Sequence, residues 1–216
     1  MFCIILHLSN FSEKSIQQIL VFINAVISIE LDVTLIVCMP NDVKLQQITS
    51  YSAIKEFIVD CITSFKDGIS PLDAAMSMAL MRLRVSKEDK RLLVLNAVPD
   101  NDEQYISIMN CIFSAQKLHV AIDSVVLTES VYLQQASFIT NGLYLCVKED
   151  KLLQNLLDAI PNEGKQRLKM SKVDFRATCF CHRKMIDIGF VCSVCLSIFC
   201  TETKECKTCL TRFVKK

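Results

Sequence analysis

Residues 2–27 decide the fold, with the sequence FCIILHLSNFSEKSIQQILVFINAVI. Their first part, FCIILHL (2–8), is apolar apart from His7, which is typical of a strand buried on both faces of a sheet. Ser12 and Glu13 then supply a helix cap and an acidic first turn. Apolar residues follow at the spacing of one helical face: Ile16, Ile19, Leu20, Ile23, Val26 and Ile27. A buried strand followed by an amphipathic helix predicts the first unit of an α/β domain.

The same alternation continues to residue 160. Further apolar runs that predict strands are VTLIVCM (33–39), RLLVLNA (91–97), VAIDSVVL (120–127) and GLYLCV (142–147). Helical patterns occupy 70–84, 103–116, 130–140 and 148–160, whereas the pattern at 54–66 fits either a strand or a helix. Buried strands that are each followed by a helix indicate a parallel sheet covered on both faces. We therefore expect a doubly wound, mostly parallel α/β domain over residues 1–160, with any functional site at the carboxyl ends of its strands.

The carboxyl ends of these strands carry few catalytic groups. The first strand ends in His7-Leu8-Ser9-Asn10-Phe11, which matches neither a glycine-rich dinucleotide loop nor a Walker A loop. RLLVLNA leads into Val98 and Pro99, and the chain contains no G-x-S-x-G nucleophile motif. The whole chain has only 4 glycines, too few for phosphate-binding loops of the usual kind. We therefore predict that the protein is not an enzyme.

Charge and cysteine are distributed unevenly behind a formal net charge of +1. Residues 1–160 carry 12 Lys and Arg against 18 Asp and Glu, whereas residues 161–216 carry 12 against 5. No secretory leader and no apolar run of membrane-spanning length is recognised, so we expect a soluble, intracellular chain. The early cysteines lie in apolar runs, where we expect buried free thiols of a reducing compartment: Cys3, Cys38, Cys61, Cys111 and Cys146.

The tail is rich in metal-ligand residue types. Seven of the 12 cysteines lie in C-F-C-H (179–182), C-S-V-C (192–195), Cys200 and C-K-T-C (206–209). Each C-x-x-C pair places two thiolates on one tight turn, where they can form half of a tetrahedral zinc shell. We predict a C4-type or RING-like zinc finger over 173–216 with one or two zinc ions, joined to the body by a basic linker at 161–172. The candidate ligands are Cys192, Cys195, Cys206, Cys209, Cys179, Cys181, His182 and Cys200.

Two pairings of these ligands are compatible with their spacing. In a cross-braced arrangement, the two C-x-x-C pairs share one metal and the group at 179–182 shares another with Cys200. In a sequential arrangement, the group at 179–182 instead joins Cys192 and Cys195, which are ligands in both cases. A module this small cannot build a sufficient apolar core alone, so a metal-binding free energy on the order of 10 kcal/mol would be its folding energy.

The string VDFRATCFCHRKMIDIGFVCSVCLSIFC (173–200), with C-K-T-C following, resembles the C-terminal zinc finger of one family. That family is the smaller von Willebrand A-type subunit of the general transcription and DNA repair factor TFIIH, which implies a von Willebrand A domain for the body. Metal-binding domains of that fold use D-x-S-x-S, a Thr and a second Asp, where this chain has residues 7–11, Ser70 and Ala97. Both carboxylates are missing, so we expect no Mg²⁺ in the body.

The resemblance also implies a function. Such a subunit is a non-catalytic structural component of the TFIIH core in the nucleus, acting in RNA polymerase II transcription initiation and nucleotide excision repair. The expected partners are the larger von Willebrand A/RING subunit and other TFIIH core subunits, with auxiliary DNA contact through basic residues in and beside the linker (Lys165, Arg167, Lys169, Lys172 and Arg176). Two alternatives are a RING-type ubiquitin ligase and a zinc-ribbon nucleic-acid-binding protein.

The predicted zinc finger contains more apolar residues than it can bury. Ile186, Ile188, Phe190 and Phe199 are too many for so small a module to bury internally. We therefore expect some of them to dock on the body or on a partner.

Overall fold

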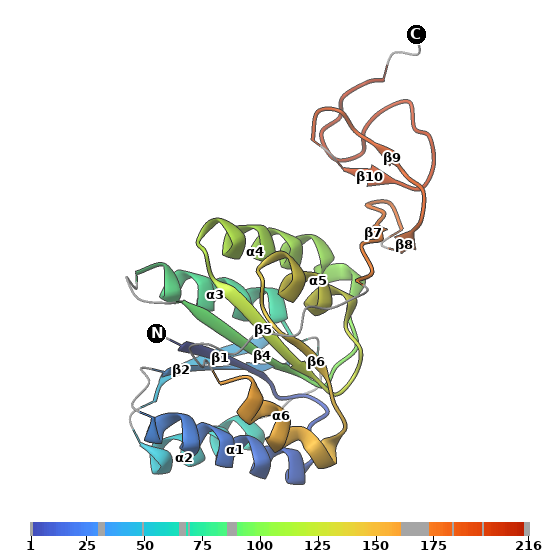
Figure 1. Ribbon diagram of the computed structural model, residues 1–216. Helices are drawn as coiled ribbons and strands as arrows, with labels where there is room; N and C mark the ends of the chain where they lie inside the picture. Colours follow the sequence, from blue (N-terminus) through green and yellow to red (C-terminus); the bar gives the residue numbers. More distant parts are fainter. Residues whose placement is uncertain are drawn as a thin grey trace.

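The computed structural model describes residues 2–29, 33–48, 50–64, 68, 70–85, 90–160, 173–182, 184–195 and 197–213. Its body is a six-stranded sheet between two layers of helices (Figure 1). The strands are β1 (Phe2–His7), β2 (Val33–Met39), β3 (Asp42–Gln47), β4 (Arg91–Asn96), β5 (Ala121–Val126) and β6 (Tyr144–Cys146). They lie in the order β3-β2-β1-β4-β5-β6, and only the β2–β3 pair is antiparallel. The predicted doubly wound, mostly parallel fold is confirmed.

The helices follow the strands as the sequence pattern predicts. They are α1 (Glu13–Ser28), α2 (Tyr51–Thr63), α3 (Leu72–Val85), α4 (Tyr105–Lys117), α5 (Val131–Ile139) and α6 (Leu152–Asp158). Short 3-10 turns precede α4 and α6 at η1 (Asp102–Gln104) and η2 (Glu149–Lys151). The helices α3, α4 and α5 cover one face of the sheet, and α1, α2 and α6 cover the other (Figure 1). Within the described residues, no helix is both long and apolar enough to cross a membrane.

The two helix layers explain why the central strands are largely apolar. Along β1, Cys3 and Ile5 belong to the core under α3 and α4, whereas Ile4 and Leu6 belong to the core over α1. All four side chains are fully buried. A strand that faces two cores is expected to carry apolar residues on both faces, which is the pattern of residues 2–6.

Two features of the structure differ from the sequence expectations, the strand β3 and the exposure of Cys146, and a third decides the ambiguous pattern at 54–66. The strand β3 was not expected, because DVKLQQ is largely polar; Asn41, with φ 62, reverses the chain and sets β3 on the sheet edge. The ambiguous pattern at 54–66 contributes to the helix α2. Four of the five early cysteines are buried, but Cys146 is exposed on the short edge strand β6, so the prediction of a buried thiol is wrong there.

The tail begins on the helix α5. The side-chain amide of Gln135 donates to the Asp174 carbonyl oxygen at 2.6 Å, and the Asp174 N–H donates to Gln134 Oε1 at 3.3 Å. The ring of Phe175 meets that of Phe138 edge-on, with centroids 5.2 Å apart. Beyond this anchor the chain forms two antiparallel pairs of two-residue strands, β7 (Ala177–Thr178) with β8 (Met185–Ile186) and β9 (Phe190–Val191) with β10 (Ile198–Phe199). The expected linker at 161–172 lies outside the described residues.

Candidate functional site

The carboxyl ends of β1 and β4 border a cavity of about 310 Å³. The two hydroxyls at the positions that bind metal in von Willebrand A domains, Ser9 and Ser70, do meet there. Their oxygens lie 3.0 Å apart and form a hydrogen bond with each other. The Gln104 side-chain amide donates to the Ser70 carbonyl oxygen at 2.8 Å. The two hydroxyls are therefore hydrogen-bonded to each other at the position where they would coordinate a cation in a metal-binding domain of this fold.

Asp100, the carboxylate among the described lining residues, already accepts hydrogen bonds within the chain. Asp100 accepts hydrogen bonds from the hydroxyl of Ser130 and from the N–H groups of Val131 and Tyr132, so it caps the first turn of α5. Ala97, at the position of the second Asp, brings no oxygen side chain. A magnesium ion requires oxygen donors that usually include one or two carboxylates. The residues present do not fit Mg²⁺, and its absence from the body stays a prediction.

His7 is a buried polar side chain that lines this cavity. It is 5% exposed, and neither ring nitrogen forms a hydrogen bond with any other described residue. The adjacent Asn96 amide is used by Val98, to which it donates and from which it accepts. Burial lowers the pKa of His7 to about 4, and the Asn96 side chain opposes this shift only in part. The imidazole is therefore neutral at physiological pH.

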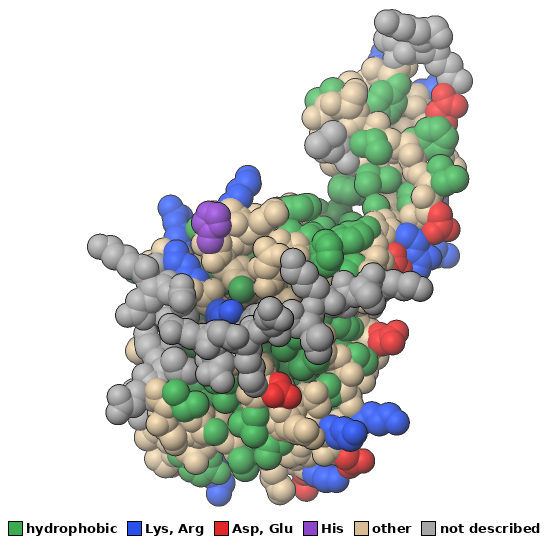
Figure 2. Space-filling view, in the orientation of Figure 1, with side chains coloured by type: hydrophobic (Ala, Val, Ile, Leu, Met, Phe, Trp, Pro, Cys, Tyr) green, Lys and Arg blue, Asp and Glu red, His purple; other side chains and the backbone are tan. Residues whose placement is uncertain are grey.

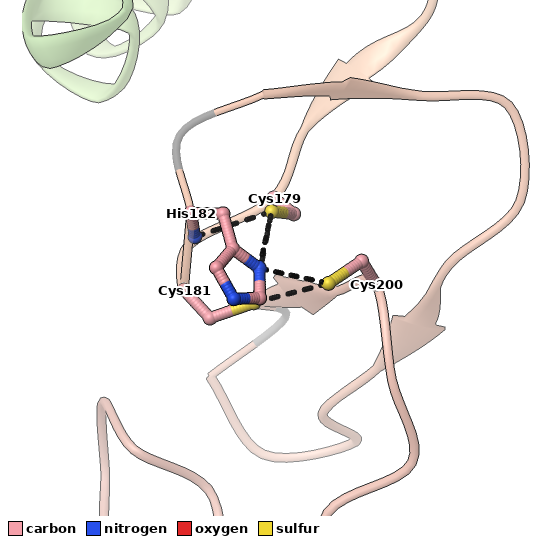
Figure 3. A group of neighbouring side chains, drawn as sticks. All are labelled: Cys179, Cys181, His182 and Cys200. Carbon is pink, nitrogen blue, oxygen red and sulfur yellow. Dashed lines mark hydrogen bonds between the residues drawn. The ribbon is translucent and has the colours of Figure 1, made fainter.

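The eight predicted ligand residues of the tail gather into two groups. The ligand atoms of the first group, which are the sulfurs and an imidazole nitrogen, all lie within 4.8 Å of one another, and so do those of the second group. In the first, Cys200 Sγ lies 3.4 Å from Cys181 Sγ and 3.0 Å from His182 Nδ1 (Figure 3). In the second, Cys195 Sγ lies 3.5 Å from Cys206 Sγ. The first group is Cys179, Cys181, His182 and Cys200, and the second is Cys192, Cys195, Cys206 and Cys209.

These separations fit tetrahedral zinc. Four sulfurs at about 2.3 Å from one ion lie about 3.8 Å from each other, close to the sulfur–sulfur distances in both groups. Soft thiolates with one imidazole are the donor types that zinc prefers. Both groups can therefore hold a metal ion, although the ligand role of each residue stays a prediction.

The two groups interleave along the chain. Cys192 and Cys195 fall between His182 and Cys200, yet they lie with Cys206 and Cys209. Of the two pairings compatible with the spacing, the ligand positions in the structure correspond to the cross-braced one. The sequential pairing, which needs the group at 179–182 beside Cys192, does not occur.

Each cysteine pair sits on the same kind of turn. The N–H of the first cysteine donates to the carbonyl oxygen five residues later, from Cys179 to Lys184, from Cys192 to Ser197 and from Cys206 to Thr211, at 2.8–2.9 Å. In two of these turns the third residue after the first cysteine also donates its N–H to that sulfur, from His182 to Cys179 at 3.3 Å and from Cys209 to Cys206 at 3.5 Å. The turn thus directs sulfurs to one side and gives those of Cys179 and Cys206 an N–H donor.

Sequence reasoning missed two hydroxyl residues that complete these turns. Ser197 Oγ lies 3.1 Å from Cys195 Sγ, and Thr211 Oγ1 lies 3.1 Å from Cys209 Sγ. Hydrogen bonding from Ser197 lowers the pKa of Cys195 to about 6, and Thr211 likewise lowers the pKa of Cys209. The signal was present in the sequence, since C-S-V-C-L-S (192–197) and C-K-T-C-L-T (206–211) are the same motif.

The apolar residues of the module are divided between a small core and its surface. Phe199 is 1% exposed and lies near Phe180, with ring centroids 6.5 Å apart. Ile188 and Phe190 are 86% and 50% exposed, so they do not dock on the body. A partner remains the expected cover for them.

The fold and these two groups define a class: a von Willebrand A-like domain followed by a cysteine-rich module that can hold two metal ions. The solved TFIIH p34 N-terminal domain matches with a TM-score of 0.62 at 20% identity, covering 72% of this chain and 95% of that one. A von Willebrand factor type A protein from Catenulispora acidiphila matches at 0.55 and 13% identity, covering 73% of this chain and 41% of that one.

Sequence comparison then gives the family. The family model of transcription factor Tfb4 matches residues 51–210, and the chain belongs to that family. It is 44% identical over 160 residues to general transcription factor IIH subunit 3 of Dictyostelium discoideum, covering 68% of this chain and 43% of that protein. It is 45% identical over 152 residues to the IIH subunit TFB4 of Arabidopsis thaliana, covering 64% and 50%. The chain spans about half the length of these curated relatives.

The two cysteine groups predict the outcome of ligand substitutions. Cys195→Ser and Cys206→Ser should each lower the zinc content of the purified chain from two ions to one, because both belong to one group, whereas Cys146→Ser should retain both ions. The double variant should still keep one ion if the groups interleave and lose both if the pairing is sequential. Elemental analysis measures the stoichiometry; undiminished zinc in either single variant would refute its ligand role.

The neutral, buried His7 predicts a pH dependence of stability. Between the ordinary pKa of 6.5 and the folded value of about 4, the unfolded chain binds a proton that the folded chain does not. The free energy of unfolding should therefore fall as pH decreases through this window, by an amount on the order of 3 kcal/mol. His7→Gln should flatten this slope.

Urea unfolding followed by tyrosine fluorescence tests the pH effect without interference from the tail. All four tyrosines lie in the body, at Tyr51, Tyr105, Tyr132 and Tyr144. The idea fails if the unsubstituted protein and His7→Gln lose stability equally between pH 7.5 and pH 4.5.

Proposed function

We propose that the chain is a non-catalytic structural subunit of the TFIIH core complex, acting in the nucleus in transcription initiation and nucleotide excision repair. Membership of the Tfb4 family carries this proposal, together with relatives whose names place them in factor IIH. The strand-end cavity supports the non-catalytic part, because its hydroxyls and its carboxylate are bonded to each other and to a helix end rather than presented to a substrate.

The proposed domain division is the one that the sequence predicts. Residues 1–160 form the von Willebrand A-like domain, residues 161–172 are the basic linker, and residues 173–216 form the zinc finger. The anchor of Asp174 and Phe175 on α5 supports a finger that is held against the body rather than tethered loosely.

Two zinc ions are the proposed cofactors of the finger. The first would be held by the group of Cys200 and the second by the group of Cys206. Their role would be structural, because all four positions of each shell are filled by protein ligands and none is left open for a substrate.

The partners would be the larger von Willebrand A/RING subunit and other core subunits. Direct binding of nucleic acid is less well supported, because Arg176 is paired with Asp174 at 2.7 Å and with Asp187 at 3.6 Å. The other predicted phosphate contacts, Lys165, Arg167, Lys169 and Lys172, lie outside the described residues.

Co-expression with the larger subunit of the same source tests the proposal. We expect a stable complex in size-exclusion chromatography with light scattering, with Cys206→Ser weakening it if the finger contributes to the interface. Two subunits that elute separately at micromolar concentration would contradict the proposed function.

The cross-braced finger favours one alternative, a RING-type ubiquitin ligase. An assay of ubiquitin discharge from loaded E2 enzymes separates the two, because a structural subunit should not accelerate discharge above the rate of free E2. Stimulation by the intact chain that is lost in Cys195→Ser would support the ligase instead.

A further inference from the structure

A groove of about 680 Å³ runs between α3 and α4 on the outer surface of the body. The two helices lie side by side on the same face of the sheet (Figure 1). Each precedes a parallel strand, so both run in the same direction and their carboxyl ends lie together. The groove takes one stripe from each helix, with Ser77, Met81 and Arg84 on α3 and Asn110, Ser114 and Lys117 on α4.

The shape of the groove fits a third helix. Its lining on α4 extends from Ser107 to Leu118, which is about 16 Å along a helix axis. Three of its lining residues are serines that allow close approach (Ser77, Ser107 and Ser114), and its apolar lining includes Leu80 and the exposed Met81. Ser77 Oγ lies 3.2 Å from Cys111 Sγ, so the two helices are tied across the floor. An apolar floor with small residues on its rims suits an amphipathic helix.

Charge differs between the two ends of the groove. Arg84 and Lys117 are exposed in the last turns of α3 and α4, and neither forms an ion pair with another described residue. Figure 2 shows Lys and Arg side chains gathered at the end where these helices finish. Beyond the opposite end of the groove lining, Asp73 lies in the first turn of α3 and Glu103 lies just before α4. The groove is thus basic at one end, and acidic residues lie beyond the other.

We propose that this groove binds one amphipathic helix of another subunit, antiparallel to α3 and α4. In that orientation an acidic first turn meets Arg84 and Lys117, and a basic last turn meets Asp73 and Glu103. Helices ordinarily carry acidic residues at their start and basic residues at their end, and antiparallel dipoles attract. This inference rests on the proposed function, because the helix would come from a TFIIH core subunit.

A photo-crosslinking experiment on the full chain, co-expressed with TFIIH core subunits, tests the site directly. p-Benzoylphenylalanine replaces Met81, which is 66% exposed in the groove, and in a control it replaces Val59, which is 50% exposed on α2 of the other face. We expect the probe at position 81 to crosslink to a helical segment of another subunit, acidic in its first turn and basic in its last. The control should not reach that segment.

Charge reversal tests the orientation. Arg84→Glu with Lys117→Glu should weaken binding to the crosslinked subunit at least about tenfold, because like charges then face the acidic turn. The matched control Lys55→Glu, an exposed lysine on α2, should leave the affinity unchanged. Circular dichroism confirms that each variant is folded.

The outcomes separate the groove from the function. If the subunits assemble but the probe at position 81 reaches a second copy of this chain, a nucleic acid, a non-helical segment or nothing, the groove proposal is overturned and the proposed function stands. If the unsubstituted chain does not assemble with the subunits, both fail.

Discussion

The C-terminal module depends on clustered sulfur and nitrogen ligands rather than on apolar packing. Its buried core consists of Cys192, Phe199 and Cys206, and two of these three are candidate ligands. Its strands are two residues long, so its sheets supply few backbone hydrogen bonds. Zinc bound at both groups would therefore supply most of the free energy of folding. Because the groups interleave, each one closes a loop that contains part of the other.

The body, in contrast, is stabilised by two extensive apolar cores, one on each face of its sheet. Its strand ends contain hydroxyls and a carboxylate, but each is bonded within the chain. Two parts of the surface of the body stand out. The helix α5 anchors the start of the finger, and α3 and α4 border a groove. Such surfaces fit the structural role that we propose.

Much of this could be predicted from the sequence, where one physical cause dominates the pattern. Burial on both faces makes β1 apolar from Phe2 to Leu6, so its strand and its place in a parallel sheet follow from residues 2–8. The edge strand β3 could not be predicted, because DVKLQQ forms a strand through its pairing with β2 after the turn at Asn41. The pairing of the cysteine groups is equally non-local. Spacing alone permits two arrangements, and the antiparallel pairing of β9 with β10 places Cys192 and Cys200 at opposite ends of one hairpin, which assigns them to different groups.

Cadmium-113 NMR of the cadmium-substituted chain tests the central claim, that two interleaved metal centres hold the finger. The account predicts two signals of equal intensity with different shifts, since one centre has four sulfur ligands and the other has three and an imidazole. One signal should couple to the β-protons of Cys192 and Cys206, and the other to those of Cys181 and Cys200. A single signal, or one that couples to both Cys181 and Cys192, would contradict it.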